Sequence, residues 1–247
     1  MNFVGVINGT DHALGELAET QKADLTITGH YSVPDTDRGL NAYVGAGVRC
    51  CHESTHVGDV IAKIRLGMYA QLRYGSAWLD LPAIAPAILE QGLDTRFVNL
   101  VSDDTHPHTI VEEGNIDRVL RVAVQCGINP IEAVQMVTIN VASCFHMDDE
   151  FGSITPGKCA DIVFLDNLSE FNALRVMIDG DVVAENGVPT FDYKPFEFPE
   201  WATHSMHVGM DITPESFRIP APEGVADDDA VRVRTIEVIS GKVGTYE

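Results

Sequence analysis

Val48-Arg49-Cys50-Cys51-His52-Glu53-Ser54-Thr55-His56 is the segment from which the fold of this chain is most directly inferred. It contains the pattern His-Glu-x-x-His, which on one helix places two imidazoles on the same side to bind zinc, with the glutamate as the general base of a protease. The residues before His52 are instead typical of a short strand, and Ser54 or Thr55 is well placed to cap a new helix. The apolar residues that follow at helical spacing are Val57, Val60, Ile61, Ile64 and Met68. We therefore expect His52 to be a ligand at a strand end and interpret the protease pattern as a chance match.

The zinc protease stays open as an alternative, because it requires only that His52 and His56 share one continuous helix and that a third ligand follows. The longer pattern His-Glu-x-x-His-x-x-Gly-x-x-His is excluded, since Asp59 and Ala62 occupy its glycine and histidine places.

Segments typical of strands alternate with segments at helical spacing through the first 150 or so residues. A short apolar run at 3–7 comes first, and the predicted strands are 24–28, the residues that end at His52, 69–74 and 96–101. The predicted helices are 10–22, 38–46, 56–68, 83–91, 116–126 and 130–142. This alternation predicts a parallel sheet, and polar residues gathered at strand ends indicate the catalytic face of a barrel.

The pattern changes at about Gly152, where strands without intervening helices are predicted. They cover 160–165, 173–178 and 181–184, and Asp179-Gly180 is a hairpin turn signal between the last two. A further strand candidate lies at 231–239. We expect a separate β subdomain after the parallel sheet.

The composition is that of a globular protein of 247 residues with 45% hydrophobic residues and a net charge of −21. Such a negative surface repels nucleic-acid phosphates and anionic lipids, so neither nucleic acid nor a membrane is expected as a partner. No uncharged apolar stretch approaches the roughly 18 residues of a membrane helix, and five cysteines without regular spacing favour a reducing, cytoplasmic location. The charge fits either an ordinary acidic cytosolic protein or a halophile, in which salt screens the self-repulsion.

Several strings along the chain form a pattern in one order. They include Gly29-His30, Leu40-Asn41-Ala42-Tyr43, His52-Glu53, Arg73-Tyr74-Gly75-Ser76-Ala77, Asp103-Asp104-Thr105-His106-Pro107 and Pro156-Gly157-Lys158-Cys159-Ala160-Asp161. This pattern resembles adenine deaminases of the amidohydrolase superfamily, nearly without gaps to about Gly187 and more faintly beyond.

The resemblance implies the C-terminal half of a (β/α)8 TIM-type barrel with a small β-sandwich subdomain. Residues 1–151 correspond to the partial barrel, 152–190 to the β subdomain, and 191–247 to a linker and the start of the family's C-terminal domain. The family's barrel also has a first strand with a His-x-His metal pair and a fourth strand with a bridging glutamate, and we expect this chain to begin just after that glutamate. His106-Pro107-His108 follows the aspartate pair and does not correspond to the first-strand element.

The resemblance implies hydrolysis of adenine to hypoxanthine and ammonia, in which a metal-activated hydroxide attacks the ring carbon that bears the amine and a carboxylate transfers the proton. His30, His52 and Asp103 are then metal ligands, and Asp103 also carries the proton. Glu53 and Asp104 are further candidates for proton transfer or for contacts with the purine nitrogens.

The remaining expectations concern substrate, metal and partners. By resemblance, Arg73 and Ser76 are substrate-binding candidates and His106 lies near the site, while His56 and His108 are expected at the surface. Histidine and carboxylate ligands suit zinc, iron or manganese; the family implies a binuclear site with manganese as the usual metal. We expect a homo-oligomer or a complementing chain that carries the missing barrel half. A catalytically incomplete fragment or assembly subunit is the alternative.

Overall fold

The structure of the chain is a computed structural model that describes residues 1–33, 35–226, 229–239 and 245–246. The chain divides into two units, one of which includes Met1–Phe191 and the other Asp192–Val238. Each unit is described separately.

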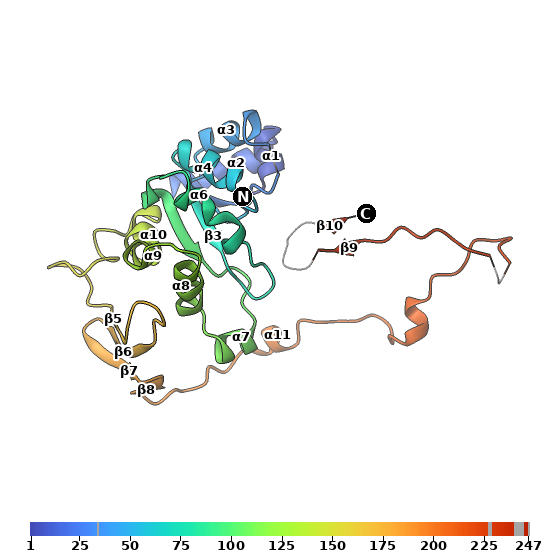
Figure 1. The fold of residues 1–247 in the computed structure, drawn as a ribbon. Coiled ribbons are helices and arrows are strands. Elements are labelled where there is room, and N and C mark those ends of the chain that lie inside the picture. Colours follow the sequence, from blue (N-terminus) through green and yellow to red (C-terminus); the bar gives the residue numbers. More distant parts are fainter. Residues whose placement is uncertain (34, 227–228, 240–244, 247) are drawn as a thin grey trace. The chain divides into compact units, whose positions relative to one another are not determined.

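A parallel sheet of four strands in the order β1-β2-β3-β4 forms the centre of the first unit; of these strands, β3 is labelled in Figure 1. The strands are β1 (Thr28–Gly29), β2 (Cys50–Cys51), β3 (Tyr69–Arg73) and β4 (Val98–Val101). Gly29 pairs with Cys51, which pairs with Ala70, which in turn pairs with Val98. All five residues of β3 are buried, as expected for a parallel strand that is covered on both faces.

Helices precede, connect and follow these strands, so the predicted alternation is confirmed. Before β2 they are α1 (Phe3–Ile7), α2 (Asp11–Lys22) and α3 (Arg38–Gly45). Between β2 and β4 they are α4 (Val57–Arg65), α5 (Leu81–Ile84), α6 (Pro86–Leu89) and the 3-10 turn η1 (Thr95–Phe97). After β4 they are α7 (Pro107–Glu112), α8 (Ile116–Gln125), α9 (Pro130–Val137) and α10 (Ile139–Cys144).

The structure corrects some of the predicted boundaries. The apolar run at 3–7 is the helix α1, which begins where the side chain of Asn2 accepts a hydrogen bond from the amide of Gly5. Neither Ser54 nor Thr55 caps α4; His56 is the N-cap, and the Asp59 carboxylate accepts its amide at 3.1 Å. The carboxylate of a first-turn residue thus satisfies a backbone donor that the helix itself leaves free.

The two larger groups of buried side chains among the described residues both lie in the first unit. One lies where α4, α8 and α9 cover the sheet and includes Leu72, Leu100 and Val119. The other lies beneath α2 and α3 and includes Leu17 and Leu40. A fully buried side chain of this size contributes about 1.5–3 kcal/mol relative to exposure. These contacts fix where each strand ends.

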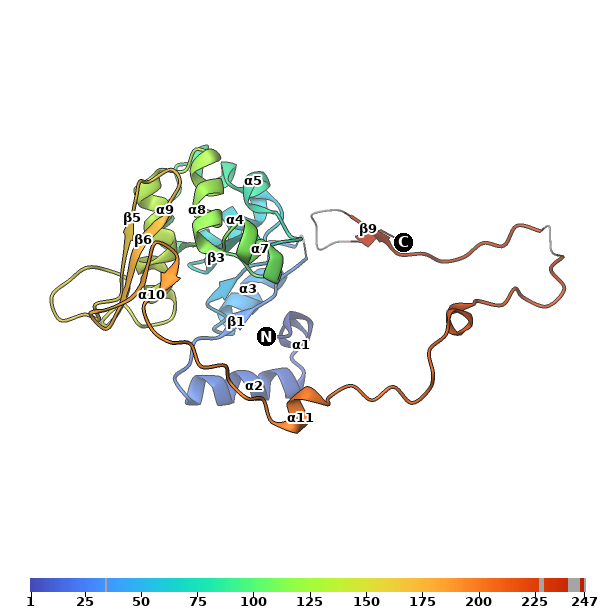
Figure 2. The ribbon, with the colours of Figure 1, turned by 90° about the horizontal axis from the view of Figure 1, so that it is seen from below.

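A second sheet of the first unit is antiparallel, with the order β5-β6-β7-β8. Its strands are β5 (Ile162–Leu165), β6 (Ala173–Ile178), β7 (Asp181–Glu185) and β8 (Val188–Pro189). Asp179 and Gly180 both have positive φ, so the predicted hairpin turn is confirmed. The buried ring of Phe171 joins the core formed by α8 and α9, which lie beside β5 and β6 (Figure 2).

The second unit contains α11 (Glu200–Thr203), the 3-10 turn η2 (Pro214–Phe217) and β9 (Glu237–Val238), which pairs with β10 (Thr245–Tyr246). The strand predicted at 231–239 is therefore longer than the observed one, since 231–236 has no strand partner among the described residues. Unpaired backbone does not form a strand, whatever its side-chain pattern.

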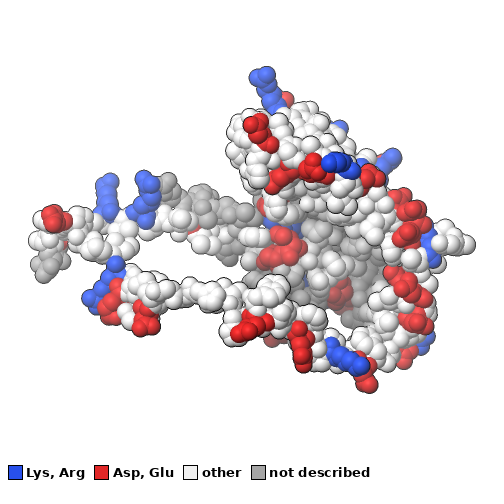
Figure 3. Space-filling model, turned by 180° about the vertical axis from the view of Figure 1, so that it is seen from behind, with Lys and Arg blue, Asp and Glu red and all other residues white. Residues whose placement is uncertain are grey.

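Acidic side chains are prominent over the face shown in Figure 3, in keeping with the net charge of −21. Within the described part of the chain, no helix combines the length and the apolar character that a membrane span requires.

Candidate metal centre

The carboxyl ends of the four parallel strands bring together side chains that are far apart in the sequence. His30 directly follows β1, His52 and Glu53 follow β2, Arg73 ends β3, and Asp103 lies two residues beyond β4. Parallel strands present these ends at the same edge of the sheet, which is where α/β proteins place their functional side chains.

Two imidazoles and a carboxylate form the tightest group at this edge. His30 Nδ1 lies 3.0 Å and His52 Nε2 3.5 Å from Oε1 of Glu53. The two imidazole rings meet edge to face with centroids 4.4 Å apart. One ligand atom from each of the three residues lies within 4.8 Å of the others. This is the separation at which three side chains can share one cation.

Asp103 is next to this group, and the distances connect it to His52. Its Oδ1 atom lies 3.9 Å from His52 Nε2. Asp103 has a φ of 62°, in the left-handed region that aspartate tolerates better than most residues. That conformation turns the chain sharply after β4. The structure thus brings together the three predicted ligands, and Glu53 lies nearer to the imidazoles than Asp103 does.

Arg73 is fully buried behind the carboxylates. Its Nη1 atom donates to Asp103 Oδ2 at 3.0 Å and lies 3.5 Å from Glu53 Oε2. Its Nε and Nη2 atoms donate to Oδ2 of Asp80 at 3.2 and 2.8 Å. The guanidinium therefore has carboxylates on two sides and no exposed surface to offer a substrate.

Burial lowers the pKa of His52 below the ordinary histidine value. The nearby carboxylates of Asp103 and Glu53 act in the opposite direction, but burial has the larger effect. A neutral imidazole is the form that binds a metal ion.

The donor set fits a divalent cation. Two imidazoles with carboxylate oxygens are ligands that zinc, iron and manganese all accept, so the residues agree with a metal centre without selecting the metal. The side chains converge without a lysine or arginine between them, because Arg73 contacts only the far oxygens of the carboxylates.

Three predicted site residues lie outside this group. Both carboxylate oxygens of Asp104 accept backbone amides, from Ala77 at 2.6 Å and Trp78 at 3.3 Å. A side chain at Gly75 would overlap Asp104, so the loops after β3 and β4 can approach only with glycine there. Asp104 thus joins two loops.

Ser76 and His106 belong to the same pair of loops. Ser76 Oγ donates to Thr109 Oγ1 at 2.9 Å and accepts a hydrogen bond from the amide of His106 at 2.8 Å. The exposed His106 ring contacts the ring of His108 with centroids 5.6 Å apart. Among the described residues, Ser76 and His106 thus contact each other and the start of α7 rather than the imidazole pair.

The protease alternative fails on its geometric requirement. His52 lies in the connection after β2, whereas His56 is the exposed N-cap of α4. The two residues do not share a helix, and the His56 ring lies 3.6 Å from Asp59 of its own first turn.

Sequence reasoning missed two buried polar residues beside the centre, Asp80 and Lys63. Lys63 lies three residues after Val60 and one before Ile64, on the apolar face of α4. This helical spacing is the sequence feature that could have indicated its burial. Asp80 precedes α5, where an aspartate is common as a helix cap, so its pattern gave no sign of a buried ion pair.

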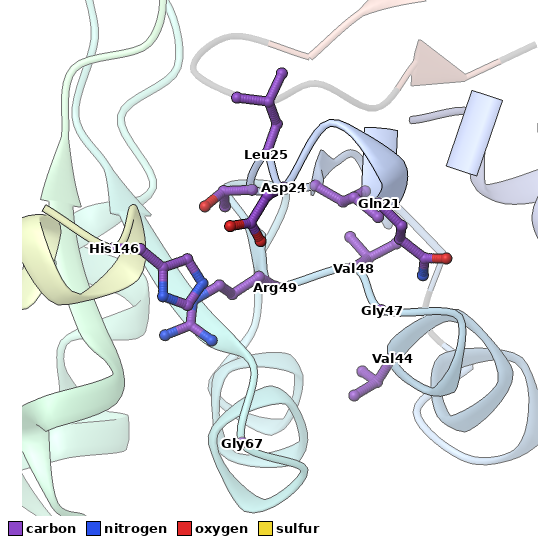
Figure 4. A pocket seen from close by; sticks show the side chains of 11 residues that line it. Gln21, Asp24, Leu25, Val44, Gly47, Val48, Arg49, Gly67 and His146 are labelled. Atoms are coloured by element: carbon purple, nitrogen blue, oxygen red, sulfur yellow. The ribbon is translucent and has the colours of Figure 1, made fainter. Parts of the chain in front are cut away.

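A separate pocket of about 340 Å3 opens near the amino ends of the strands (Figure 4). Its lining includes Ile27 before β1, Arg49 before β2 and Gly67 before β3. The Arg49 guanidinium is tied to backbone carbonyl oxygens of Ser143 and Cys144 at 3.0 and 2.7 Å. It therefore anchors α10 to the sheet.

Comparison with known proteins agrees with the fold. Residues 79–183 match the model of the amidohydrolase family. A crystal structure of an uncharacterized protein aligns with 68% of this chain and 48% of its own, with a TM-score of 0.51 at 15% identity, which is a likeness of fold. Over residues 79–183 the chain is thus similar to the amidohydrolase family.

Within that family, the similarity over the whole chain is to adenine deaminases. The chain is 52% identical over 247 residues to an adenine deaminase of Clostridium botulinum (strain ATCC 19397 / Type A) and 44% identical over 245 residues to one of Moorella thermoacetica. These matches confirm the predicted resemblance to the adenine deaminase family. The chain spans 41% of the length of each of these two relatives.

Proposed function

We propose that this chain carries part of the active site of an adenine deaminase, in which adenine and water give hypoxanthine and ammonia. The observation that carries the proposal is the convergence of His30, His52, Glu53 and Asp103 from three strand ends. The 52% identity to an adenine deaminase supports adenine as the substrate.

In this proposal His30, His52 and Asp103 hold a divalent cation, with Glu53 close enough to share it. A bound cation would supply Lewis-acid activation of the attacking water. Asp103, whose side chain is 26% exposed, accepts the proton from that water and delivers it to the amino group as ammonia leaves. Glu53, 9% exposed, orients the imidazole of His30 and is the second candidate for proton transfer.

We propose that the four parallel strands are half of a (β/α)8 barrel, and that other residues supply the other half with its metal ligands. Residues 1–151 would form the barrel portion, 152–190 the β subdomain and 191–247 a linker and the start of the C-terminal domain. The missing half would lie elsewhere in the same polypeptide or in a complementing chain.

We further propose a binuclear manganese site, with iron or zinc as alternatives, in a cytoplasmic homo-oligomer. All five cysteines are free, which suits a reducing compartment.

The test uses the chain alone and the chain mixed with a polypeptide that supplies the missing strands. Bound metal would be measured after manganese loading, and ammonia release would be measured with adenine. We expect His52→Asn to lower bound manganese by at least about 10-fold, whereas His56→Asn, in the same sequence pattern but at an exposed helix cap, leaves it unchanged.

Absence of metal binding by the unsubstituted chain under both conditions would contradict the metal centre. Metal binding without ammonia release in the completed assembly would favour a non-catalytic assembly subunit over the deaminase.

A further inference from the structure

Arg73 meets Glu53 and Asp103 each at one carboxylate oxygen. Its Nη1 atom lies 3.0 Å from Oδ2 of Asp103 and 3.5 Å from Oε2 of Glu53. The other oxygen of each carboxylate points to an imidazole: Oε1 of Glu53 lies 3.0 Å from His30 Nδ1, and Oδ1 of Asp103 lies 3.9 Å from His52 Nε2. One guanidinium nitrogen therefore sets the rotation of both carboxylates.

Asp80 fixes the guanidinium itself. Its Oδ2 atom accepts from both Nε and Nη2 of Arg73, and both side chains are fully buried. The ring of Trp78 covers the guanidinium, with Cζ 4.8 Å from the ring centroid. A planar guanidinium that is hydrogen-bonded along one edge and covered on one face by an aromatic ring has little freedom to rotate.

We propose that Arg73, held by Asp80, is a positioning residue that makes Glu53 and Asp103 each present a single oxygen to the cation site. This inference rests on the proposed metal centre. It replaces the expected substrate contact of Arg73 with an action through the two carboxylates, and it gives Asp80 a part in the same site.

A simple buried ion pair would stabilise the fold without affecting the cation. In a positioning role the planar shape of the guanidinium matters for cation binding, whereas in a simple ion pair only its charge matters. Lysine retains the positive charge but has a single nitrogen, so it cannot bridge Asp80 and both carboxylates. Arg73→Lys therefore separates the effect of geometry from that of charge. Asp80→Asn is nearly isosteric and loosens the guanidinium from the opposite side.

The experiment titrates cobalt(II) into the full chain, with the complementing polypeptide if that is needed for binding, and records the visible absorption of the bound ion. This spectrum reports the number and arrangement of ligands. We expect Arg73→Lys to change the spectrum and weaken cobalt binding by about 10-fold, the lower end of the range for residues that orient metal ligands. Asp80→Asn should shift the spectrum in the same direction by a smaller amount.

The control is Arg175→Lys, which alters an arginine–glutamate pair between β6 and β7 with Nη2–Oε1 at 2.7 Å. We expect it to keep the unsubstituted spectrum and affinity. Circular dichroism and thermal melting show whether each variant is folded, and Asp80→Asn keeps the test decisive if Arg73→Lys does not fold.

A folded Arg73→Lys or Asp80→Asn variant with unchanged spectrum and affinity would overturn the positioning role and leave the metal centre intact. Failure of the unsubstituted protein to bind cobalt would instead overturn the proposed metal centre, and this inference with it.

Discussion

Lys63 Nζ on α4 donates to Ser54 Oγ at 2.9 Å, in the segment that follows His52 and Glu53. The same ammonium lies 3.5 Å from the backbone oxygen of Tyr31, the residue after His30. Lys63 is 1% exposed. One buried side chain thus links the two segments that carry the imidazoles.

We expect Lys63→Met to lower the free energy of unfolding by about 1–3 kcal/mol, because the buried oxygens of Ser54 and Tyr31 lose their donor. Urea denaturation measures the loss. Lys22→Met is the matched control, since Lys22 is exposed and pairs with Glu19 of the same helix at 3.5 Å. Equal stability of the two variants would show that the link contributes nothing.

Substitution of Asp104 can show whether its carboxylate has a catalytic or a structural role. Its oxygens accept the amides of Ala77 and Trp78. We expect Asp104→Ala to lower the free energy of unfolding by about 1–3 kcal/mol while manganese affinity stays within about twofold, because the half-buried amide of Trp78 and the exposed amide of Ala77 lose a charged acceptor. Denaturation and metal titration give the two values.

Asp104→Asn is the matched variant, since its amide oxygen still accepts one of these amides, and it should recover part of the stability. A large loss of metal affinity in Asp104→Asn, with the fold retained, would return Asp104 to the candidate site residues.

The lowered pKa of His52 predicts a pH dependence of the metal-free chain. Burial keeps the pKa of His52 in the folded chain below the ordinary value of about 6.5. The imidazole of His52 therefore binds a proton more readily in the unfolded chain than in the folded one. The His52 contribution to stability is therefore present above about pH 6.5 and is lost as the pH falls toward the folded pKa. Imidazole NMR signals, assigned with His52→Asn, measure the titration in the folded and urea-unfolded states. A folded midpoint at or above the unfolded one would contradict the prediction.

The strand ends and the histidines at them were predictable from the sequence because both depend on local pattern. The apolar strand before Ser102 and Asp103, and the helical spacing after His56, fix where the chain turns. Parallel pairing then brings these turns to one edge of the sheet. The convergence of His30, His52 and Asp103 therefore needs little beyond the order of the elements.

The surroundings of these side chains were less predictable. Arg73 was predicted to contact the substrate, whereas in the structure its buried partner is Asp80, seven residues later. Asp104 adjoins Asp103, yet the positive φ of Asp103 directs the two carboxylates to different partners. The short run at 3–7 is apolar enough for a strand or a helix, and the cap from Asn2 accompanies the helix. Partners of buried polar groups depend on three-dimensional packing, which the local pattern does not record.

Cys51 gives a last prediction, which separates packing from support of the site. Its Sγ atom accepts the amides of Tyr31 at 3.1 Å and Glu53 at 3.4 Å, so it joins the residue after His30 to a carboxylate of the centre. Cys50→Ala and Cys51→Ala remove the same atom from equally buried neighbours in β2, and both should lower stability. Only Cys51→Ala should also weaken cobalt binding, by about 10-fold, and speed hydrogen exchange at the amides of Tyr31 and Glu53. Both variants lose the same side-chain volume, but only Cys51→Ala loses the sulfur that accepts the amides of Tyr31 and Glu53. Equal cobalt affinity in the two variants would therefore mean that Cys51 contributes only packing.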